Sequence, residues 1–218
     1  ARQNWALGLD DNGRPIENPE TIADRDGALV YPDDDGAANW YSPTYSPQTG
    51  LIYQNVRETG ATYYLADATY EPGRIYMGAS RRAVQDEDPR GYLRALNALT
   101  GDLVWEIEVH TPPWAGLMST AGGLVFSGTT DGDFFAAHAE TGDVLWRFQT
   151  GGGIYANPIT YMSEGRQFIA IAGGNALFNF ALPDTNQRAL AFPLWILASL
   201  ALGLLATLLS SRKTQLRG

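Results

Sequence analysis

Residues 95–105, ALNALTGDLVW, and residues 136–146, AAHAETGDVLW, are near copies of one another. Thr-Gly-Asp and the closing tryptophan recur 41 residues apart. Self-similarity at a spacing of about 40 to 50 residues is typical of β-propeller blades, because one four-stranded unit cannot bury its own apolar faces and must stack against a neighbour. The repeat therefore predicts an all-β fold of stacked blades.

The repeated residues have a mechanical interpretation. Gly101 and Gly142 permit the positive φ that a hairpin turn requires, and the aspartate that follows each can hydrogen-bond to nearby backbone. Trp105 and Trp146 offer large flat surfaces. We expect these two tryptophans to pack between adjacent blades rather than to bind a ligand.

Short strands are expected at regular intervals along the rest of the chain. Residues 1–38 are rich in Asp, Asn, Gly and Pro and are predicted to be loop, and residues 84–90 are predicted to be a charged loop. Alternation and turn residues predict strands at 42–45, 50–53, 62–66, 91–97 and 103–109, and then one complete blade from 123–128, 133–138, 144–148 and 167–172.

The number of blades is small for a propeller. At one blade per 41 residues, the 218-residue chain holds at most about four before its apolar end, whereas closed propellers have about 4 to 8. The sequence begins at Ala1 without an initiator methionine or a signal peptide. We therefore expect the C-terminal part of a longer propeller.

Charge and cysteine content exclude several classes of function. The net charge is −9, and all 24 acidic residues precede position 188, so a nucleic-acid partner is not expected. The absence of cysteine excludes disulfides, thiol catalysis, thiolate metal sites and CxxCH haem attachment within this chain.

A membrane span is predicted near the C-terminus. Residues 189–209 form a 21-residue stretch without a charge, long enough as a helix to cross about 30 Å of hydrocarbon. Arg212, Lys213 and Arg217 follow it, so the positive-inside rule places the C-terminus in the cytoplasm and the propeller at the periplasmic face of a bacterial inner membrane. The alternative is a long buried helix of the domain. The expected domains are a partial propeller over 1–187, a transmembrane helix over 188–211 and a basic tail over 212–218.

An ordered set of motifs resembles a known family. The segments are Asn4-Trp5-Ala6 with Gly13-Arg14-Pro15, ANWYSPTYSPQTG at 38–50, WAGLMSTAGGLVFSG at 114–128, and the Thr-Gly-x-x-x-Trp repeats. Their order resembles the C-terminal part of the pyrroloquinoline-quinone (PQQ)-dependent alcohol dehydrogenases of the methanol/ethanol type. The resemblance implies an eight-bladed periplasmic propeller. It also implies oxidation of an alcohol to an aldehyde with PQQ over Ca²⁺ or a lanthanide, and electron transfer to cytochrome c or a membrane quinone.

The resemblance carries three cofactor-binding residues onto this chain. Asn39 matches the asparagine whose amide hydrogen-bonds to the quinone, Trp40 stands beside it, and Trp114 matches the tryptophan that lines the edge of the cofactor. Neutral amide and indole donors suit a planar ligand with carbonyl and carboxylate oxygens. Alternatively, Asn39 is a turn asparagine that caps loop backbone, and Trp114 is a packing residue after Pro112 and Pro113.

The resemblance also implies what this chain lacks. The catalytic aspartate and the metal ligands of the family lie on earlier blades, so no catalytic residue and no metal ligand is expected here, and the chain alone is expected to be inactive. The run Asp33-Asp34-Asp35 lacks the alternate ligand spacing of a calcium loop, and Asp10-Asp11-Asn12-Gly13 has the composition of a turn. His110 and His138 are isolated from other potential ligands.

The sequence is also compatible with two other functions. One is a non-catalytic propeller of the same repeat family that serves as a membrane-anchored scaffold or assembly protein. The other is a separately encoded half that pairs with a second chain carrying the N-terminal part of the propeller, because an unpaired half would expose strand edges.

Overall fold

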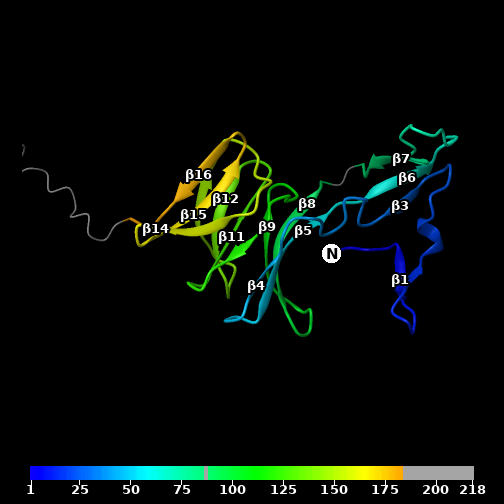
Figure 1. Ribbon diagram of the computed structural model, residues 1–218. Helices are drawn as coiled ribbons and strands as arrows, with labels where there is room; N and C mark the ends of the chain where they lie inside the picture. The colour runs from blue at the N-terminus through cyan, green and yellow to red at the C-terminus, as the bar shows by residue number, and fades with distance from the viewer. Residues whose placement is uncertain (86–87, 184–218) are drawn as a thin grey trace, which may run out of the picture. The chain divides into compact units, whose positions relative to one another are not determined.

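The computed structural model describes residues 1–85 and 88–183. Over these residues the fold is all-β, and every sheet is antiparallel (Figure 1). Residues 1–180 form one compact unit, and the contacts described below lie within it. The predicted all-β class is confirmed.

Two four-stranded sheets form the centre of the fold. The first pairs β4 (Thr44–Ser46), β5 (Leu51–Glu58), β8 (Arg90–Asn97) and β9 (Leu103–Val109) in that order. The second pairs β10 (Met118–Ser119), β11 (Leu124–Gly128), β12 (Asp133–His138) and β13 (Val144–Gln149). Each sheet has the simple up-and-down order of a propeller blade.

One strand of the predicted complete blade was assigned wrongly. Residues 167–172 do not join the second blade, since they lie in β15 (Arg166–Gly173), which pairs with β14 (Ile159–Ser163) and β16 (Ala176–Phe180) in a separate sheet. The fourth strand of the blade is instead β10, which contains only two residues. A strand that short has no visible alternation, so sequence periodicity could not find it.

The prediction that residues 1–38 are loop is also wrong in part. β1 (Ala6–Leu9) pairs with β2 (Pro15–Glu17), a short 3₁₀ helix covers Pro19–Thr21, and β3 (Ala28–Val30) follows. Strands of three or four residues leave no sustained pattern. Asp10-Asp11-Asn12-Gly13 is the turn between β1 and β2, as its composition predicts.

A long insertion separates the two middle strands of the first blade. Residues 129–132 are enough to join β11 to β12, whereas residues 59–89 join β5 to β8. The insertion carries β6 (Ala61–Leu65) and β7 (Ala79–Ala83), and β6 pairs with β3 on its other edge. The first blade therefore carries a small additional sheet built partly from the N-terminal residues.

The two Thr-Gly-Asp turns have the same internal hydrogen bonds. Thr100 Oγ1 donates to Asp102 Oδ2 at 2.6 Å, and Thr141 Oγ1 donates to Asp143 Oδ2 at 2.7 Å. The glycines between them have φ of 77° and 78°. The positive φ predicted for both glycines is confirmed, and each motif closes the hairpin between the third and fourth strands of its blade. The aspartates differ from the prediction, because their carboxylates accept from the threonine hydroxyls rather than from nearby backbone groups.

Trp105 connects the first blade to the second. Its side chain is only 9% exposed, and its indole Nε1 donates to the carbonyl oxygen of Ala139 at 3.1 Å. The hydroxyl of Tyr53 donates to the same oxygen at 3.0 Å. Gly142 lies beneath the indole, where a Cβ atom would stand 2.7 Å from Trp105 Cε3. The packing role predicted for Trp105 is confirmed.

Trp146 has the corresponding position between the second blade and the sheet of β14, β15 and β16, which is the third sheet. Its ring lies edge to face with Phe180 of β16, with centroids 4.9 Å apart. It is 38% exposed, because among the described residues β16 is the last strand of that sheet. This tryptophan also packs against a neighbouring sheet, as expected.

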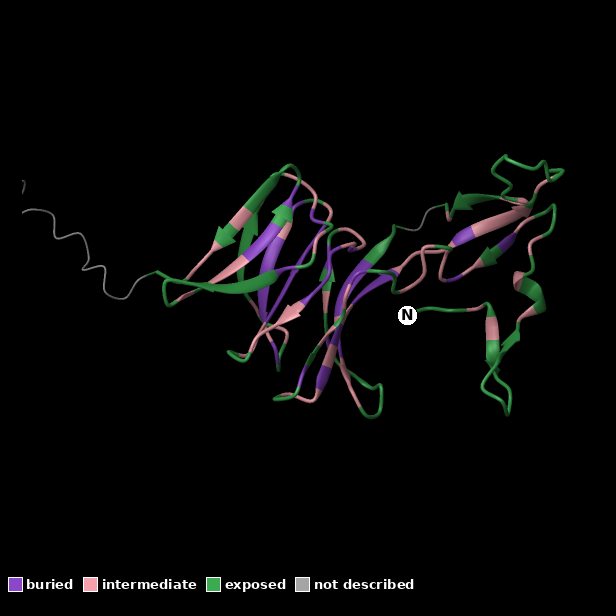
Figure 2. Ribbon diagram, viewed as in Figure 1, coloured by how far each residue is buried: buried purple, intermediate pink, exposed green. Residues whose placement is uncertain are grey.

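The second blade is buried on both faces. Val125 and Phe135 belong to a core shared with Tyr53, Leu93 and Trp105 of the first blade. The alternate residues of β11 and β12 belong to a second core, which the second blade shares with the third sheet. The buried residues of this second core include Phe126, Phe134, Ile154 and Ile171. Figure 2 shows this burial as continuous purple along the middle strands. Burial of both faces is what stacking of blades requires.

The predicted transmembrane helix over 188–211 and the basic tail lie outside the described residues, as does the expected boundary at residue 187. Within residues 1–85 and 88–183, no helix is long and apolar enough to cross a membrane.

Substitution of Gly142 tests the contact between the blades. Gly142→Ala is expected to destabilise the protein by about 1 kcal/mol for its positive φ and by roughly 1–3 kcal/mol more for the clash with Trp105. The matched control is Gly101→Ala, because Gly101 has nearly the same φ, and the added methyl group would have no described residue within 4 Å apart from its neighbours in the chain. Urea denaturation of both variants measures the difference, and equal free energies of unfolding would contradict the proposed packing.

Candidate functional site

The two segments that carry the family resemblance lie side by side. The backbone N–H of Leu117 donates to the carbonyl oxygen of Ser42 at 3.0 Å, and Asn157 Nδ2 donates to Ser42 Oγ at the same distance. Trp40 and Trp114, 74 positions apart in the chain, are thereby brought together.

Three aromatic rings form the contact. Trp40 stacks on Trp114 with centroids 6.4 Å apart and an interplanar angle of 26°. Tyr41 meets Trp114 edge to face, at 6.1 Å and 89°. Tyr41 is fully buried, whereas Trp40 is 62% exposed. Burial raises the pKa of the Tyr41 hydroxyl, and the Arg57 charge opposes that shift.

The backbone after Trp114 is fixed by buried polar groups. Asn55 of β5, which is 1% exposed, donates through Nδ2 to Ala115 O and to Ser127 Oγ, both at 2.8 Å. Gly116 allows the side chain of Asn157 to approach, since a Cβ atom there would meet Asn157 Oδ1 at 1.6 Å. Both blades and the segment that leads into the third sheet therefore determine where Trp114 stands.

A buried arginine covers the ring of Trp114. The guanidinium carbon of Arg57 lies 4.1 Å from the ring centroid, which is a cation–π distance. Arg57 is 6% exposed and pairs with Asp35, at 3.4 Å between Nη2 and Oδ2. Its Nε has no hydrogen-bond partner among the described residues, and neither has Thr59 Oγ1.

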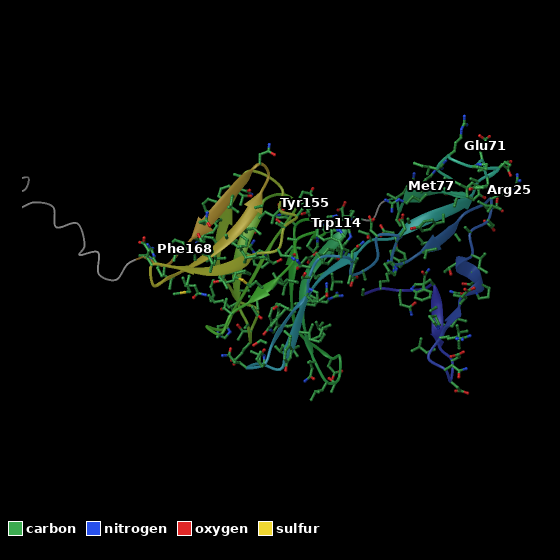
Figure 3. All side chains as sticks on the ribbon, in the orientation of Figure 1. Arg25, Glu71, Met77, Trp114, Tyr155 and Phe168 are labelled. Carbon is green, nitrogen blue, oxygen red and sulfur yellow. The ribbon has the colours of Figure 1, made fainter. Side chains whose placement is uncertain are left out.

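These side chains line a pocket of about 560 Å³. Its wall includes Arg57 and Thr59 at the end of β5, Arg81 from β7 of the insertion, and Trp114, Thr130 and Tyr155 from the loops of the blades. Figure 3 labels Trp114 and Tyr155, two of its aromatic side chains. An aromatic surface with several hydrogen-bond donors suits a planar ligand that carries oxygen atoms.

Asn39 does not line this pocket. Its Nδ2 donates to Asp35 O at 2.7 Å, and its Oδ1 accepts from Trp40 N at 2.7 Å. These bonds are those of a turn asparagine, the alternative considered for this residue. They also set the position of Trp40, so a role of Asn39 at the cofactor stays a prediction.

The acidic run is paired with Arg81. The Arg81 guanidinium lies 3.9 Å from Asp33 and 4.0 Å from Asp35, and it hydrogen-bonds to Asp34. Tyr63 donates to Asp34 Oδ1 at 2.8 Å. Burial of Tyr63, together with its bond to Asp34, raises the pKa of the Tyr63 hydroxyl to about 12. These carboxylates are held by an arginine and a tyrosine.

No group of three or more potential ligands that could hold a metal ion is found within residues 1–85 and 88–183. His138 Nδ1 accepts a hydrogen bond from the backbone N–H of Glu140 at 3.3 Å, beside the Thr-Gly-Asp turn. This contact gives His138 a structural role.

Sequence reasoning missed Arg57 and Thr59. A signal was present in β5, where Leu51, Tyr53, Asn55 and Arg57 alternate and all four are buried. An arginine at an inward position of a strand is rare and requires partners. Thr59, in contrast, gave no signal, because it stands at the start of an insertion without a pattern.

Comparison with known proteins gives a consistent result. The family model described as PQQ, the glucose/ethanol/alcohol dehydrogenase β-propeller domain, matches residues 106–169. The quinoprotein alcohol dehydrogenase PedH of Pseudomonas putida is 36% identical over 178 residues, which cover 78% of this chain and 30% of the relative. The lanthanide-dependent methanol dehydrogenase of Methylacidiphilum fumariolicum is 38% identical over 179 residues, with 78% and 29% covered.

Among solved structures, a europium-containing methanol dehydrogenase superposes with a TM-score of 0.72 at 36% identity. The match covers 78% of this chain and 31% of that chain. This chain thus spans about 30% of the length of the curated relatives described above. It belongs to the PQQ-dependent β-propeller family of the quinoprotein alcohol dehydrogenases and corresponds to a part of their propeller.

Proposed function

We propose that this chain is part of a quinoprotein dehydrogenase that oxidises alcohols to aldehydes with PQQ, and that it supplies one wall of the cofactor site. The observation that carries the proposal is the position of Trp114, which stacks with Trp40, lies under a buried arginine and lines a pocket. A scaffold needs the packing of Trp105 but has no use for this arrangement.

Bound PQQ supplies two-electron oxidation of the alcohol. The residues of this chain bind and orient it: Trp114 presents its indole to the ligand, and Arg57 fixes that ring and adds a positive charge. The structure fits this role, because aromatic surface and donors with no partner among the described residues occur in one wall. The metal, Ca²⁺ or a lanthanide, would be held by ligands outside this chain.

We further propose that the enzyme is anchored by residues 188–211 with its propeller at the periplasmic face of the membrane. The uncharged stretch 189–209 and the basic residues after it support this arrangement. Anchoring would bring the site close to a membrane quinone or a membrane-bound cytochrome c as the electron acceptor.

Asn39→Ala tests the cofactor role predicted for Asn39. In the complete protein that contains this chain, the variant is expected to weaken PQQ binding by about tenfold, through loss of an amide hydrogen bond and of the support for Trp40. The dissociation constant is measured by quenching of tryptophan fluorescence. The control is Asn12→Ala, at another exposed turn. An unchanged constant in Asn39→Ala would leave Asn39 with its turn role alone.

The double variant Asp33→Asn, Asp34→Asn tests whether the acidic run holds the metal. We expect the metal content of the purified complete protein, measured by mass spectrometry after dialysis, to equal that of the wild type, because Arg81 and Tyr63 already pair with these carboxylates. Asp35 is left intact to preserve its pair with Arg57. Loss of stoichiometric metal would contradict this prediction.

A further inference from the structure

We propose that Arg57 and Thr59 form a pair of hydrogen-bond donors for an acceptor oxygen of the ligand that lies against Trp114. The inference rests on the proposed function and extends it, because neither residue belongs to the motifs that carry the family resemblance.

The first observation is that two donors, two positions apart in the chain, have no partner in the part of the chain that the structure describes. Arg57 Nε and Thr59 Oγ1 are the two buried side-chain nitrogen or oxygen atoms without a hydrogen bond among residues 1–85 and 88–183. Buried polar groups in native proteins are almost always paired. Both exceptions belong to residues that line one pocket, which points to an acceptor that a ligand provides.

The second observation is the incomplete compensation of the Arg57 charge. Its ion pair with Asp35 is long, at 3.4 Å, and uses only Nη2. Arg94, on the neighbouring strand β8, differs in this respect. It bonds to Glu58 at 2.7 Å through Nη2 and to Glu106 at 2.9 Å through Nε. Arg94, whose role is structural, thus has a carboxylate partner for both of these nitrogens, whereas Arg57 has one for Nη2 alone.

The third observation is the location of the pair. Both side chains line the pocket with Trp114, and the Arg57 guanidinium already contacts the Trp114 ring. A threonine hydroxyl can take any of three staggered χ1 positions, so it can follow an acceptor placed in the pocket. A guanidinium and a hydroxyl can both donate to an acceptor oxygen, and the positive charge of Arg57 favours an acceptor with negative charge.

Thr59→Val separates a binding role from a structural one. Valine keeps the shape and removes an oxygen that has no hydrogen-bond partner in the described part of the chain. We expect the melting temperature of the ligand-free complete protein to rise and its affinity for PQQ to fall by about tenfold. A residue that only supports the fold would not give changes of opposite sign.

The matched control is Thr129→Val. Thr129 is 2% exposed, and its hydroxyl accepts from Asp133 N at 3.1 Å. This variant is expected to lower the melting temperature and to leave the dissociation constant for PQQ unchanged. Arg57→Met is expected to weaken PQQ binding by roughly a hundredfold, whereas Arg94→Met, which breaks two ion pairs, should leave it unchanged.

The results distinguish this inference from the proposed function. A wild-type protein that does not bind PQQ overturns both. If the wild-type protein binds PQQ and the Thr59→Val variant binds it equally well with an unchanged melting temperature, only the donor pair is overturned. Ordered water is then the hydrogen-bond partner of these two atoms. The trimethyl ester of PQQ then identifies the oxygen: a Thr59→Val effect confined to the free acid indicates a carboxylate, and an equal effect on both indicates a quinone carbonyl.

Discussion

One carbonyl oxygen holds the two blades in register. Ala139 O accepts from the indole of Trp105 and from the hydroxyl of Tyr53, so both of its lone pairs are used by side chains of the neighbouring blade. Each bond contributes only about 1 kcal/mol net, but the donors are buried, and leaving one unpaired would cost more than the bond contributes. Sliding one blade along the other would break both bonds and move the indole off Gly142. These two hydrogen bonds therefore fix the position of one blade relative to the other more than they add to the stability of the fold.

The site depends on that register. Trp114 stands on the connection between the first and second blades. Asn55 of the first blade bonds to the residue after it, and Asn157, which follows the second blade, lies close to Gly116. Trp40 approaches from the segment before the first blade. None of these contacts is local in sequence, so the pocket wall forms only when the blades have stacked. A change at Trp105 would thus reach the site without touching any residue that lines the pocket.

A part of the structure could be predicted from the sequence where interactions between residues close in the chain determine it. The Thr-Gly-Asp turns and their tryptophans were predictable, because a hairpin with positive φ needs particular residues at fixed spacing. β10, with two residues, and β3, whose partner β6 lies in an insertion, left no pattern. At the site, Trp40 and Trp114 came from ordered motifs, whereas Arg57 needed three-dimensional context. Its charge is compatible with an inward position only because Asp35 and the Trp114 ring approach it from distant segments.

Burial of the Arg57 guanidinium costs free energy of desolvation, which favourable contacts must offset. Removing an arginine from water is unfavourable by several kcal/mol unless its donors are paired, and Asp35 satisfies one nitrogen at long range. The cation–π contact recovers part of the cost, about 2 kcal/mol when desolvated. The rest is recovered when the pocket contains an acceptor. Affinity for a ligand and stability of the ligand-free protein are therefore opposed at this position, because the donors that have no partner among residues 1–85 and 88–183 are preorganised for the ligand.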